Sequence, residues 1–238
     1  MTTLPTLDGG ATLLVGLDDA PPAPIQIGSP ESGDFRGYEA DLLLELQRRL
    51  GVRLRYRRAL WSVIVGELTS GTLDVVCSAA TVTEERRREV DFCRPHLELC
   101  LAVVRRDDDV SGVGLRGARV GVRRGTTAEA FVRADGAAAS MRVSESNDEL
   151  YAALRDREVD AVVDDSPMAT YFSRMGPGLR VCGLVPGSGA AYAIMLRKGN
   201  AVLRNALDAA LDDMASDGTL GAFRDRWLDA GEAADTAS

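Results

Sequence analysis

The 238-residue chain lacks the residue spacings that are typical of metal sites and of nucleophilic catalysis. It has one histidine, His96, and no Cys-x-x-Cys or zinc-ligand spacing. No Ser-His-Asp, Cys-His or metal-ligand cluster can be assembled from local spacing, so we expect no metal and no cofactor. The four cysteines stand in apolar, strand-like surroundings, which favours unpaired buried thiols. They are Cys77, Cys93, Cys100 and Cys182.

Long apolar runs and concentrated positive charge are also missing. No segment reaches the ~18 consecutive apolar residues of a membrane helix, so we expect no membrane insertion. The net charge is −8 and only one cationic residue is a lysine, Lys198, which argues against a nucleic-acid partner. The N-terminus lacks the basic and apolar segments of a signal peptide. As written, the chain is expected to be cytoplasmic, as free thiols also suggest; it is extracytoplasmic if a leader was removed.

What is present is an alternation of strand and helix patterns that occurs twice. The expected strands are 12–17, 52–56, 73–78, 118–123, 140–143, 159–163 and 191–196, and the expected helices are 38–50, 62–68, 127–133, 147–155, 201–213 and one ending near 228. This alternation predicts an α/β fold with crossover helices. We expect two lobes, joined by extended segments near 101–106 and 190–196, with a ligand cleft between them.

Two stretches repeat one local pattern: an apolar strand, a short turn and Thr-x-x-Glu. They are Thr81-Val82-Thr83-Glu84 and Thr126-Thr127-Ala128-Glu129. Thr-x-x-Glu predicts a capping box, and a helix N-terminus is also a favourable place for an anion. With Arg86 in the first turn of one helix, the two sites together are suited to a small carboxylate.

Plainer interpretations stand beside this one. The threonines can be helix caps alone, each worth ~1 kcal/mol. Arg86 begins an Arg-Arg-Arg run, and such a run is usually a solvated helix face. Trp61 can be a core residue or a pocket residue, and His96 can be a structural histidine.

Ten motifs occur in an order that resembles one family. They are Asp18, Gly37-Tyr38-Glu39-Ala40-Asp41-Leu42, Thr81 to Arg86, Val90-Asp91-Phe92-Cys93-Arg94-Pro95, Gly125-Thr126-Thr127, Val159 to Asp165, Tyr192-Ala193-Ile194, Arg197-Lys198-Gly199, Asp217-Gly218-Thr219 and Trp227. Residues 12–228 thereby resemble the polar-amino-acid class of extracytoplasmic solute-binding proteins, the receptors of ABC importers. The resemblance implies the two-lobe, type 2 periplasmic-binding-protein fold. Lobe 1 would comprise 12–103 plus 195–230 and lobe 2 would comprise 104–194, with flexible ends at 1–11 and 231–238.

The resemblance also implies a ligand-binding set. In that family the arginine matching Arg86 pairs with the ligand α-carboxylate, which a planar guanidinium can grip through two hydrogen bonds. The aspartate matching Asp165 takes the α-ammonium, so that neither charge is buried unpaired. The remaining positions of the set are Asp18, Trp61, Ser78, Ala79, Thr81, Thr126 and Thr127. Because Asp164 and Asp165 are adjacent in a strand, one of them should face the cleft and one should face away; the resemblance favours Asp165.

The chain departs from the family pattern at two places. The first loop, which carries an aromatic residue in the family, here reads Pro21-Pro22-Ala23-Pro24-Ile25, and the aromatic after Phe-x-x-Pro is His96. The side-chain specificity is therefore open. The residues implied to bind the carboxylate and ammonium groups of the ligand are all present. Their presence disfavours a third possibility, a sensor or partner-binding module that no longer binds a solute.

Two functions are compatible with these motifs and with the resemblance. The first is a monomeric protein that closes around an α-amino acid or related carboxylate and serves an ABC permease. The second is a cytoplasmic enzyme on the same scaffold, similar to cyclohexadienyl (prephenate or arogenate) dehydratase. That enzyme type places a glutamate three residues beyond the position of Asp165, where this chain has Met168. Asp165, Asp164 or His96 would then have to act as the acid.

Overall fold

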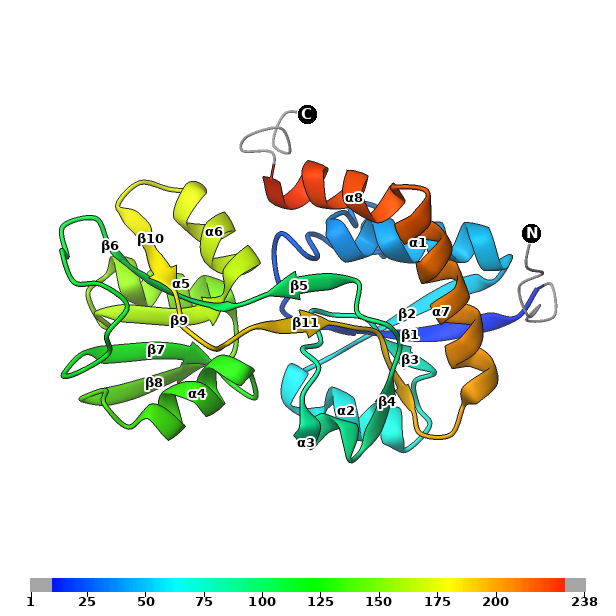
Figure 1. Cartoon of the computed structure of the whole chain (residues 1–238), viewed down its shortest axis with the longest axis horizontal. Helices are drawn as coiled ribbons and strands as arrows, with labels where there is room; N and C mark the ends of the chain where they lie inside the picture. Colours follow the sequence, from blue (N-terminus) through cyan, green and yellow to red (C-terminus); the bar gives the residue numbers. More distant parts are fainter. Residues whose placement is uncertain (1–9, 230–238) are drawn as a thin grey trace. The chain divides into compact units, whose positions relative to one another are not determined.

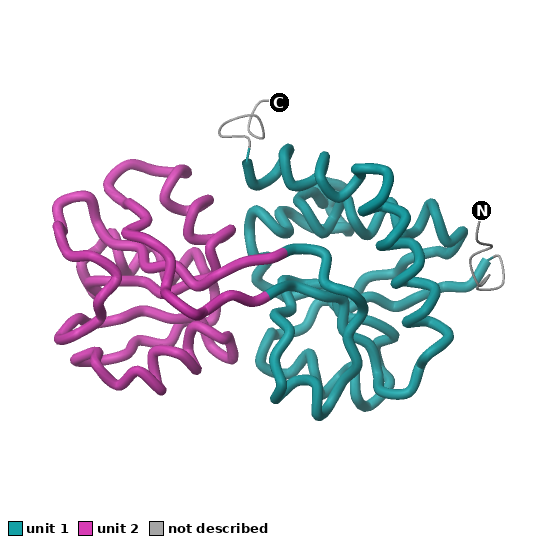
Figure 2. The backbone as a smooth tube through the Cα atoms, viewed as in Figure 1, with its two compact units in different colours: residues 1–97, 191–238 teal, residues 98–190 magenta. Residues whose placement is uncertain are grey.

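The alternation of strands and helices forms two five-stranded sheets in the computed structural model, which describes residues 10–229 (Figure 1). The chain divides into two units (Figure 2). Unit 1 contains Met1–Leu97 and Ala191–Ser238, and unit 2 contains Glu98–Ala190. Of the ends expected to be flexible, only residues 10 and 11 belong to the described residues.

Unit 1 is built on a five-stranded sheet with the strand order β2-β1-β3-β12-β4. β1 runs parallel to β2 and β3, and β12 runs antiparallel to β3 and β4. The strands are β1 (Thr12–Asp18), β2 (Arg53–Ala59), β3 (Val75–Val76), β4 (Val90–Phe92) and β12 (Met195–Arg197). The helices are α1 (Tyr38–Leu50), α2 (Trp61–Thr69), α3 (Glu84–Arg87), α7 (Ala201–Ser216) and α8 (Thr219–Arg224), followed by the π-helical turn η1 (Asp225–Asp229).

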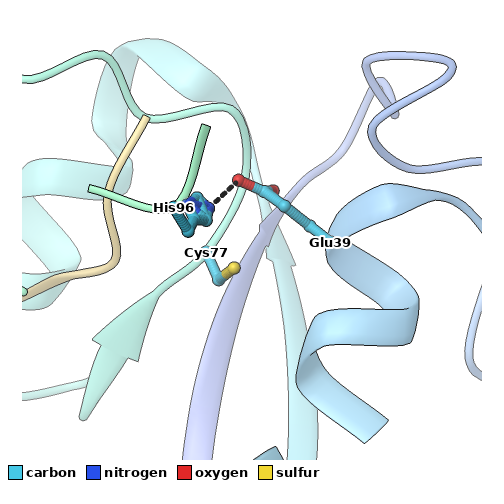
Figure 3. Close-up of side chains that lie close together, drawn as sticks. All are labelled: Glu39, Cys77 and His96. Atoms are coloured by element: carbon cyan, nitrogen blue, oxygen red, sulfur yellow. Dashed lines mark hydrogen bonds and ion pairs between the residues drawn. The ribbon is translucent and has the colours of Figure 1, made fainter. Parts of the chain in front are cut away.

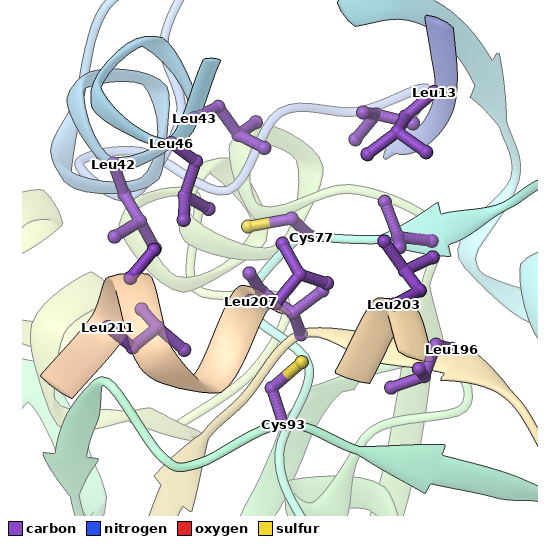
Figure 4. Packing of buried hydrophobic residues seen from close by; sticks show 14 of the residues in the cluster. Leu13, Leu42, Leu43, Leu46, Cys77, Cys93, Leu196, Leu203, Leu207 and Leu211 are labelled. Atoms are coloured by element: carbon purple, nitrogen blue, oxygen red, sulfur yellow. The ribbon is translucent and has the colours of Figure 1, made fainter. Parts of the chain in front are cut away.

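The core of unit 1 is formed by the apolar stripes of α1 and α7 against one face of the sheet (Figure 4). Leu42 and Leu46 of α1 meet Leu207 and Leu211 of α7. Each fully buried leucine contributes roughly 1.5–3 kcal/mol. Two of the thiols, Cys77 and Cys93, are buried in this cluster as predicted, whereas the other two are partly exposed, and all four cysteines are free.

The start of α1 is set by the loop that precedes it. The amides of Tyr38 and Glu39 donate to the carbonyls of Pro24 and Ile25, at 3.2 and 3.0 Å. Gly37, the N-cap, has φ 125°, and a Cβ there would lie 2.6 Å from the Ile25 carbonyl oxygen. Only glycine therefore fits where loop and helix meet. This contact brings the first turn of α1, with Glu39, into the interior of unit 1.

Unit 2 is built on a second five-stranded sheet with the order β10-β6-β9-β7-β8. β7 runs parallel to β8 and β9, whereas β6 runs antiparallel to β9 and β10. The strands are β6 (Leu101–Arg106), β7 (Arg119–Arg123), β8 (Ser140–Ser144), β9 (Ala161–Asp165) and β10 (Leu179–Leu184), and the helices are α4 (Thr127–Asp135), α5 (Asn147–Arg155) and α6 (Ser166–Arg174). α6 and β10 were not expected from the sequence.

Of the two segments expected to join the units, the one near 190–196 is confirmed and the one near 101–106 is wrong. Residues 101–106 do not form a linker but the buried strand β6 of the second sheet. The chain crosses at β5 (Leu97–Leu99) and β11 (Ala190–Tyr192), which pair with each other. The division thus falls a few residues before the expected boundaries at 103/104 and 194/195. An apolar run has the same appearance in a buried strand and in a linker, and only its pairing partners distinguish the two.

Candidate functional site

Arg86 differs from the two arginines that follow it. Its side chain is half-buried, whereas Arg87 and Arg88 are exposed. Its Nη1 donates to the carbonyl of Thr81 at 2.7 Å, and its Cζ lies 5.0 Å from the ring centroid of Trp61. A guanidinium at this distance from an indole is attracted by the ring. The solvated-face interpretation therefore fits Arg87 and Arg88 but not Arg86.

Trp61 begins α2 and has two kinds of neighbour. It is partly buried and packs against a core cluster that contains Ile64 and Val76. It also contacts Arg86. The alternatives of core residue and pocket residue are therefore compatible, because the indole side chain has both an apolar contact and a contact with Arg86, the residue expected to bind a carboxylate.

The expected capping box at Thr81 is wrong. The N-cap of α3 is Thr83, whose Oγ1 accepts from the amide of Arg86 at 3.1 Å. Thr81 instead forms a β-bridge with Tyr192, so the helix begins later than its Thr-x-x-Glu pattern predicts. α3 also has only four residues, and so few aligned peptides make a weak dipole. The local features that the sequence suggested for an anion in unit 1 are thus reduced to the side chain of Arg86.

The second capping box, in unit 2, is confirmed. Thr126 is the N-cap of α4, and its Oγ1 accepts from the amide of Glu129 at 3.3 Å. The Glu129 carboxylate accepts from the amide of Gly125 at 2.7 Å. The same arrangement begins α5, where Ser146 accepts from the amide of Glu149 at 3.2 Å. The motif thus marks a helix start, and a ligand role for Thr126 needs support beyond it.

The two adjacent aspartates of β9 have different surroundings. Asp164 is buried; its carboxylate accepts from the Tyr151 hydroxyl at 3.1 Å and from the amide of Asp165 at 2.9 Å. Burial and the neighbouring Asp165 charge raise the pKa of Asp164 to about 7. The Asp165 carboxylate instead lies 3.5 Å from Oγ1 of Thr127. Within unit 2 the structure therefore brings Asp165 and Thr127 together and leaves Asp164 with Tyr151.

In unit 1 three further predicted positions lie at the ends of β1 and β3. Oγ of Ser78 accepts from the amide of Asp18 at 3.0 Å, and the Asp18 carboxylate accepts from the amide of Ala20 at 3.1 Å. Ala79 has φ 51°, a left-handed conformation that non-glycine residues rarely adopt. Its amide donates to both carboxylate oxygens of Glu39, at 2.9 and 3.1 Å. The carboxylate of Glu39 therefore holds this turn.

His96 lies inside unit 1 (Figure 3). Its side chain is 0% exposed, Nε2 lies 3.1 Å from Oε1 of Glu39, and Nδ1 lies 3.1 Å from the carbonyl of Tyr192. Both ring nitrogens thus have partners inside unit 1, and the role of His96 as an acid in the enzyme alternative stays a prediction. These contacts fit the structural interpretation.

Sequence reasoning missed Glu39 and Gln26 as members of this network. Gln26 donates to Oε2 of Glu39 at 3.1 Å and to the carbonyl of Cys77 at 2.6 Å. A signal for Glu39 existed: it lies three and four residues before Leu42 and Leu43, on the apolar face of α1. A carboxylate on a buried helix face must have partners. Gln26 lies in an irregular loop and carries no such signal.

One group within residues 10–229 has metal-ligating atoms close together. Glu39, Cys77 and His96 each offer one such atom, and these lie within 4.8 Å of one another. Both Glu39 oxygens and both His96 nitrogens already have hydrogen-bond partners. We interpret the group as a hydrogen-bond network rather than a metal centre. None of the described helices is long and apolar enough to cross a membrane.

Comparisons with known proteins identify a family. The model of the bacterial extracellular solute-binding proteins, family 3, matches residues 13–230. The L-cystine-binding protein TcyJ of Escherichia coli (strain K12) is 30% identical over 225 residues, which are 92% of this chain and 83% of that protein.

Solved structures extend the likeness. An ancestral arginine-binding protein bound to arginine is 31% identical, with a TM-score of 0.83 over 93% of this chain and 100% of that one. An ancestral amino acid-binding protein, AncCDT-1, a precursor of cyclohexadienyl dehydratase, is 28% identical, with a TM-score of 0.84 over 92% of this chain and 96% of that one. The predicted fold class, an α/β two-lobe periplasmic-binding-protein fold, is confirmed.

Proposed function

The chain belongs to the bacterial extracellular solute-binding proteins, family 3, and we propose that it binds an α-amino acid as the solute-binding component of an ABC importer. Relatives named for binding cystine, glutamine and histidine support this assignment. Their named ligands share the α-carboxylate and α-ammonium groups and differ in the side chain. The proposal therefore concerns the shared part and leaves the side chain open.

The observation that carries the proposal is the setting of Arg86. Its guanidinium is oriented by the Thr81 carbonyl and by the Trp61 ring. A guanidinium held in one orientation loses less entropy when it binds a carboxylate through two hydrogen bonds. In this proposal Arg86 binds the α-carboxylate of the amino acid, with Thr81 and Trp61 beside it.

Unit 2 would supply the second group of contacts. We propose that Thr126 and Thr127 donate to the carboxylate and that Asp165 accepts from the α-ammonium, together with a main-chain carbonyl near Ser78 or Ala79. The proximity of Thr127 to Asp165 supports this, because one small ligand can then contact both side chains through its adjacent carboxylate and ammonium groups. Asp18, next to Ser78, is the remaining member of the proposed set.

A calorimetric screen tests the proposal. The purified chain is titrated with each proteinogenic L-amino acid and with L-cystine, and we expect at least one to bind without being converted. Arg86→Ala should then weaken binding by roughly 1.5–3 kcal/mol, about 10- to 150-fold, the value of a hydrogen bond to a charged group. Arg88→Ala is the matched control, since Arg88 is exposed in the same arginine run. A screen without a single binder, or equal losses in both variants, would contradict the proposal.

The enzyme alternative is supported by the burial of Asp164 and by the likeness to AncCDT-1. Asp164 has a pKa raised to about 7 by burial, so a carboxylic acid that can donate a proton exists near neutral pH in unit 2. The likeness to AncCDT-1 gives the chemistry to test. Incubation with prephenate and arogenate, followed by ultraviolet detection of an aromatic product, decides between binding and turnover. Product formation that Asp164→Asn abolishes would favour the dehydratase; no product favours the binding protein.

A further inference from the structure

The Glu39 carboxylate is the centre of a buried network in unit 1 (Figure 3). Oε2 accepts from the Ala79 amide at 2.9 Å and from Gln26 Nε2 at 3.1 Å. Oε1 lies 3.1 Å from Nε2 of His96. The network therefore connects the first turn of α1, the turn after β3 and the segment before β5.

The position of the proton on His96 follows from its partners. Nδ1 faces the carbonyl oxygen of Tyr192, which can only accept, so Nδ1 must carry a hydrogen. In a neutral ring Nε2 is then an acceptor, and it faces Oε1 of Glu39. Two acceptors at this distance repel each other unless a proton lies between them. With the proton on Oε1, Oε2 remains the carbonyl oxygen that accepts from Gln26 and from the Ala79 amide, which lies closer to Oε2 (2.9 Å) than to Oε1 (3.1 Å).

The surroundings favour this uncharged form. Burial raises the pKa of Glu39 to about 7 and lowers the pKa of His96 to about 4, so both directions favour a protonated carboxyl and a neutral ring. The Tyr38 hydroxyl and the Cys77 thiol interact with Glu39, and Tyr56 and Cys93 in turn interact with Cys77; burial raises the pKa of each of these four groups above its ordinary value. The positive charge of Arg224 partly opposes the rise in the pKa of Tyr38. The carboxylate of Asp18 accepts from the amide of Ala20.

We propose that Glu39 is a positioning residue for ligand binding: protonated and hydrogen-bonded to His96, it holds Ala79 in the left-handed conformation that directs the neighbouring main-chain carbonyls toward the α-ammonium of the ligand. This inference rests on the proposed function for the ligand. Loss of the shared proton has a definite consequence. The ring must move its hydrogen to Nε2 to satisfy the carboxylate, and the bond from Nδ1 to the Tyr192 carbonyl is then lost.

The proton position can be tested without a ligand. His96 is the only histidine, so its ring nitrogens give unambiguous signals in a histidine-labelled NMR sample. From about pH 5 to about pH 6.5 we expect the neutral Nδ1–H tautomer, although an ordinary histidine is largely cationic at the lower of these values. Above about pH 7.5 we expect a shift toward the Nε2–H tautomer. EDTA is included so that a metal ion on Nε2 is not mistaken for either form. An Nε2–H or cationic ring at about pH 6 would overturn the inference.

Variants of Glu39 separate positioning from packing. Glu39→Gln imitates the protonated carboxyl, since its amide can donate to His96 Nε2 while its carbonyl accepts from Ala79. It should keep the Nδ1–H tautomer at all pH values and keep the Ala79 amide protected from hydrogen exchange. Glu39→Leu should lose that protection at least tenfold. Equal exchange in both variants would show that Glu39 does not hold the turn.

Binding completes the test with the amino acid that binds most tightly in the calorimetric screen. Wild-type affinity should fall several-fold from about pH 6 to about pH 8, and Glu39→Gln should bind as at pH 6 throughout, whereas Glu39→Leu should bind at least tenfold more weakly. A pH dependence that is the same in wild type and Glu39→Gln would overturn the inference. If no amino acid binds, the proposed function fails, and the tautomer and exchange measurements still decide whether Glu39 and His96 hold Ala79.

Discussion

The guanidinium of Arg86 lies over the indole ring of Trp61, with 5.0 Å between Cζ and the ring centroid. This relationship connects the start of α2 with α3, through two residues 25 positions apart in the chain. It places an oriented cation next to an aromatic surface within unit 1. The pair is therefore the part of the candidate site that can be tested most directly.

Removing the aromatic ring should weaken amino-acid binding. Trp61→Leu keeps an apolar side chain but removes the π-system, so we expect a loss of about 0.5–2 kcal/mol, roughly 2- to 30-fold in affinity. Trp61→Phe retains a smaller ring and should lose less. Calorimetric titration with the tightest-binding amino acid measures both. Equal losses in the two variants would indicate that Trp61 acts through packing alone.

The adjacent threonines of unit 2 should differ in their effect on stability, because both are proposed to bind the carboxylate but only Thr126 also caps α4. Thr126→Ala removes the N-cap of α4 and should lower stability by about 1 kcal/mol, or about 2–4 °C in Tm. Thr127→Ala leaves the cap intact and should mainly weaken binding, because its hydroxyl lies near Asp165. Thermal melts and titrations of both variants test this, and a larger Tm loss in Thr127→Ala would contradict it.

Asp164 should make the fold less stable as the pH rises. Its folded-state pKa is raised to about 7, so between its ordinary value and about 7 the folded state binds more protons than the unfolded state. Stability from this group is present in acid and is lost as the pH rises through about 7, at about 1.4 kcal/mol per unit of pKa shift. Asp164→Asn, which cannot ionise, should therefore gain stability relative to wild type from about pH 5 to about pH 8. Melts across this range that run parallel would refute the assignment.

Glycine is required at one end of α1 and only favoured at the other. Gly37→Ala would combine a strained φ with a Cβ 2.6 Å from the Ile25 carbonyl oxygen, so we expect a loss of roughly 3 kcal/mol or more. Gly51→Ala is the matched control at the C-terminal end, where φ is 65° and nothing lies within 4 Å of a Cβ; it should lose about 1 kcal/mol. Urea unfolding measures both. Similar losses would mean that the loop yields to the new side chain.

Much of the architecture could be predicted from residue patterns. The leucines of α1 recur with helical spacing and Gly51 ends the helix, so its bounds, 38–50, were predicted as the structure has them. The N-cap of α4 at Thr126 was also predicted, since the capping signal is contained in four residues. β6 was taken for a linker, and Thr81 for a cap, because in both cases a strand partner far along the chain decides the outcome.

The sequence by itself determined the α/β class, the family and the chemical types of the candidate ligand-binding residues, because these depend on local periodicity and on the order of short motifs. Only the tertiary structure decided that Arg86 rests on Trp61, that Asp165 rather than Asp164 lies near Thr127, and that His96 is bonded to Glu39. Each of these depends on side chains from different elements that meet after folding. Hydrogen bonds and burial act over a few ångströms in space, and no spacing along the chain records which residues will come within that distance.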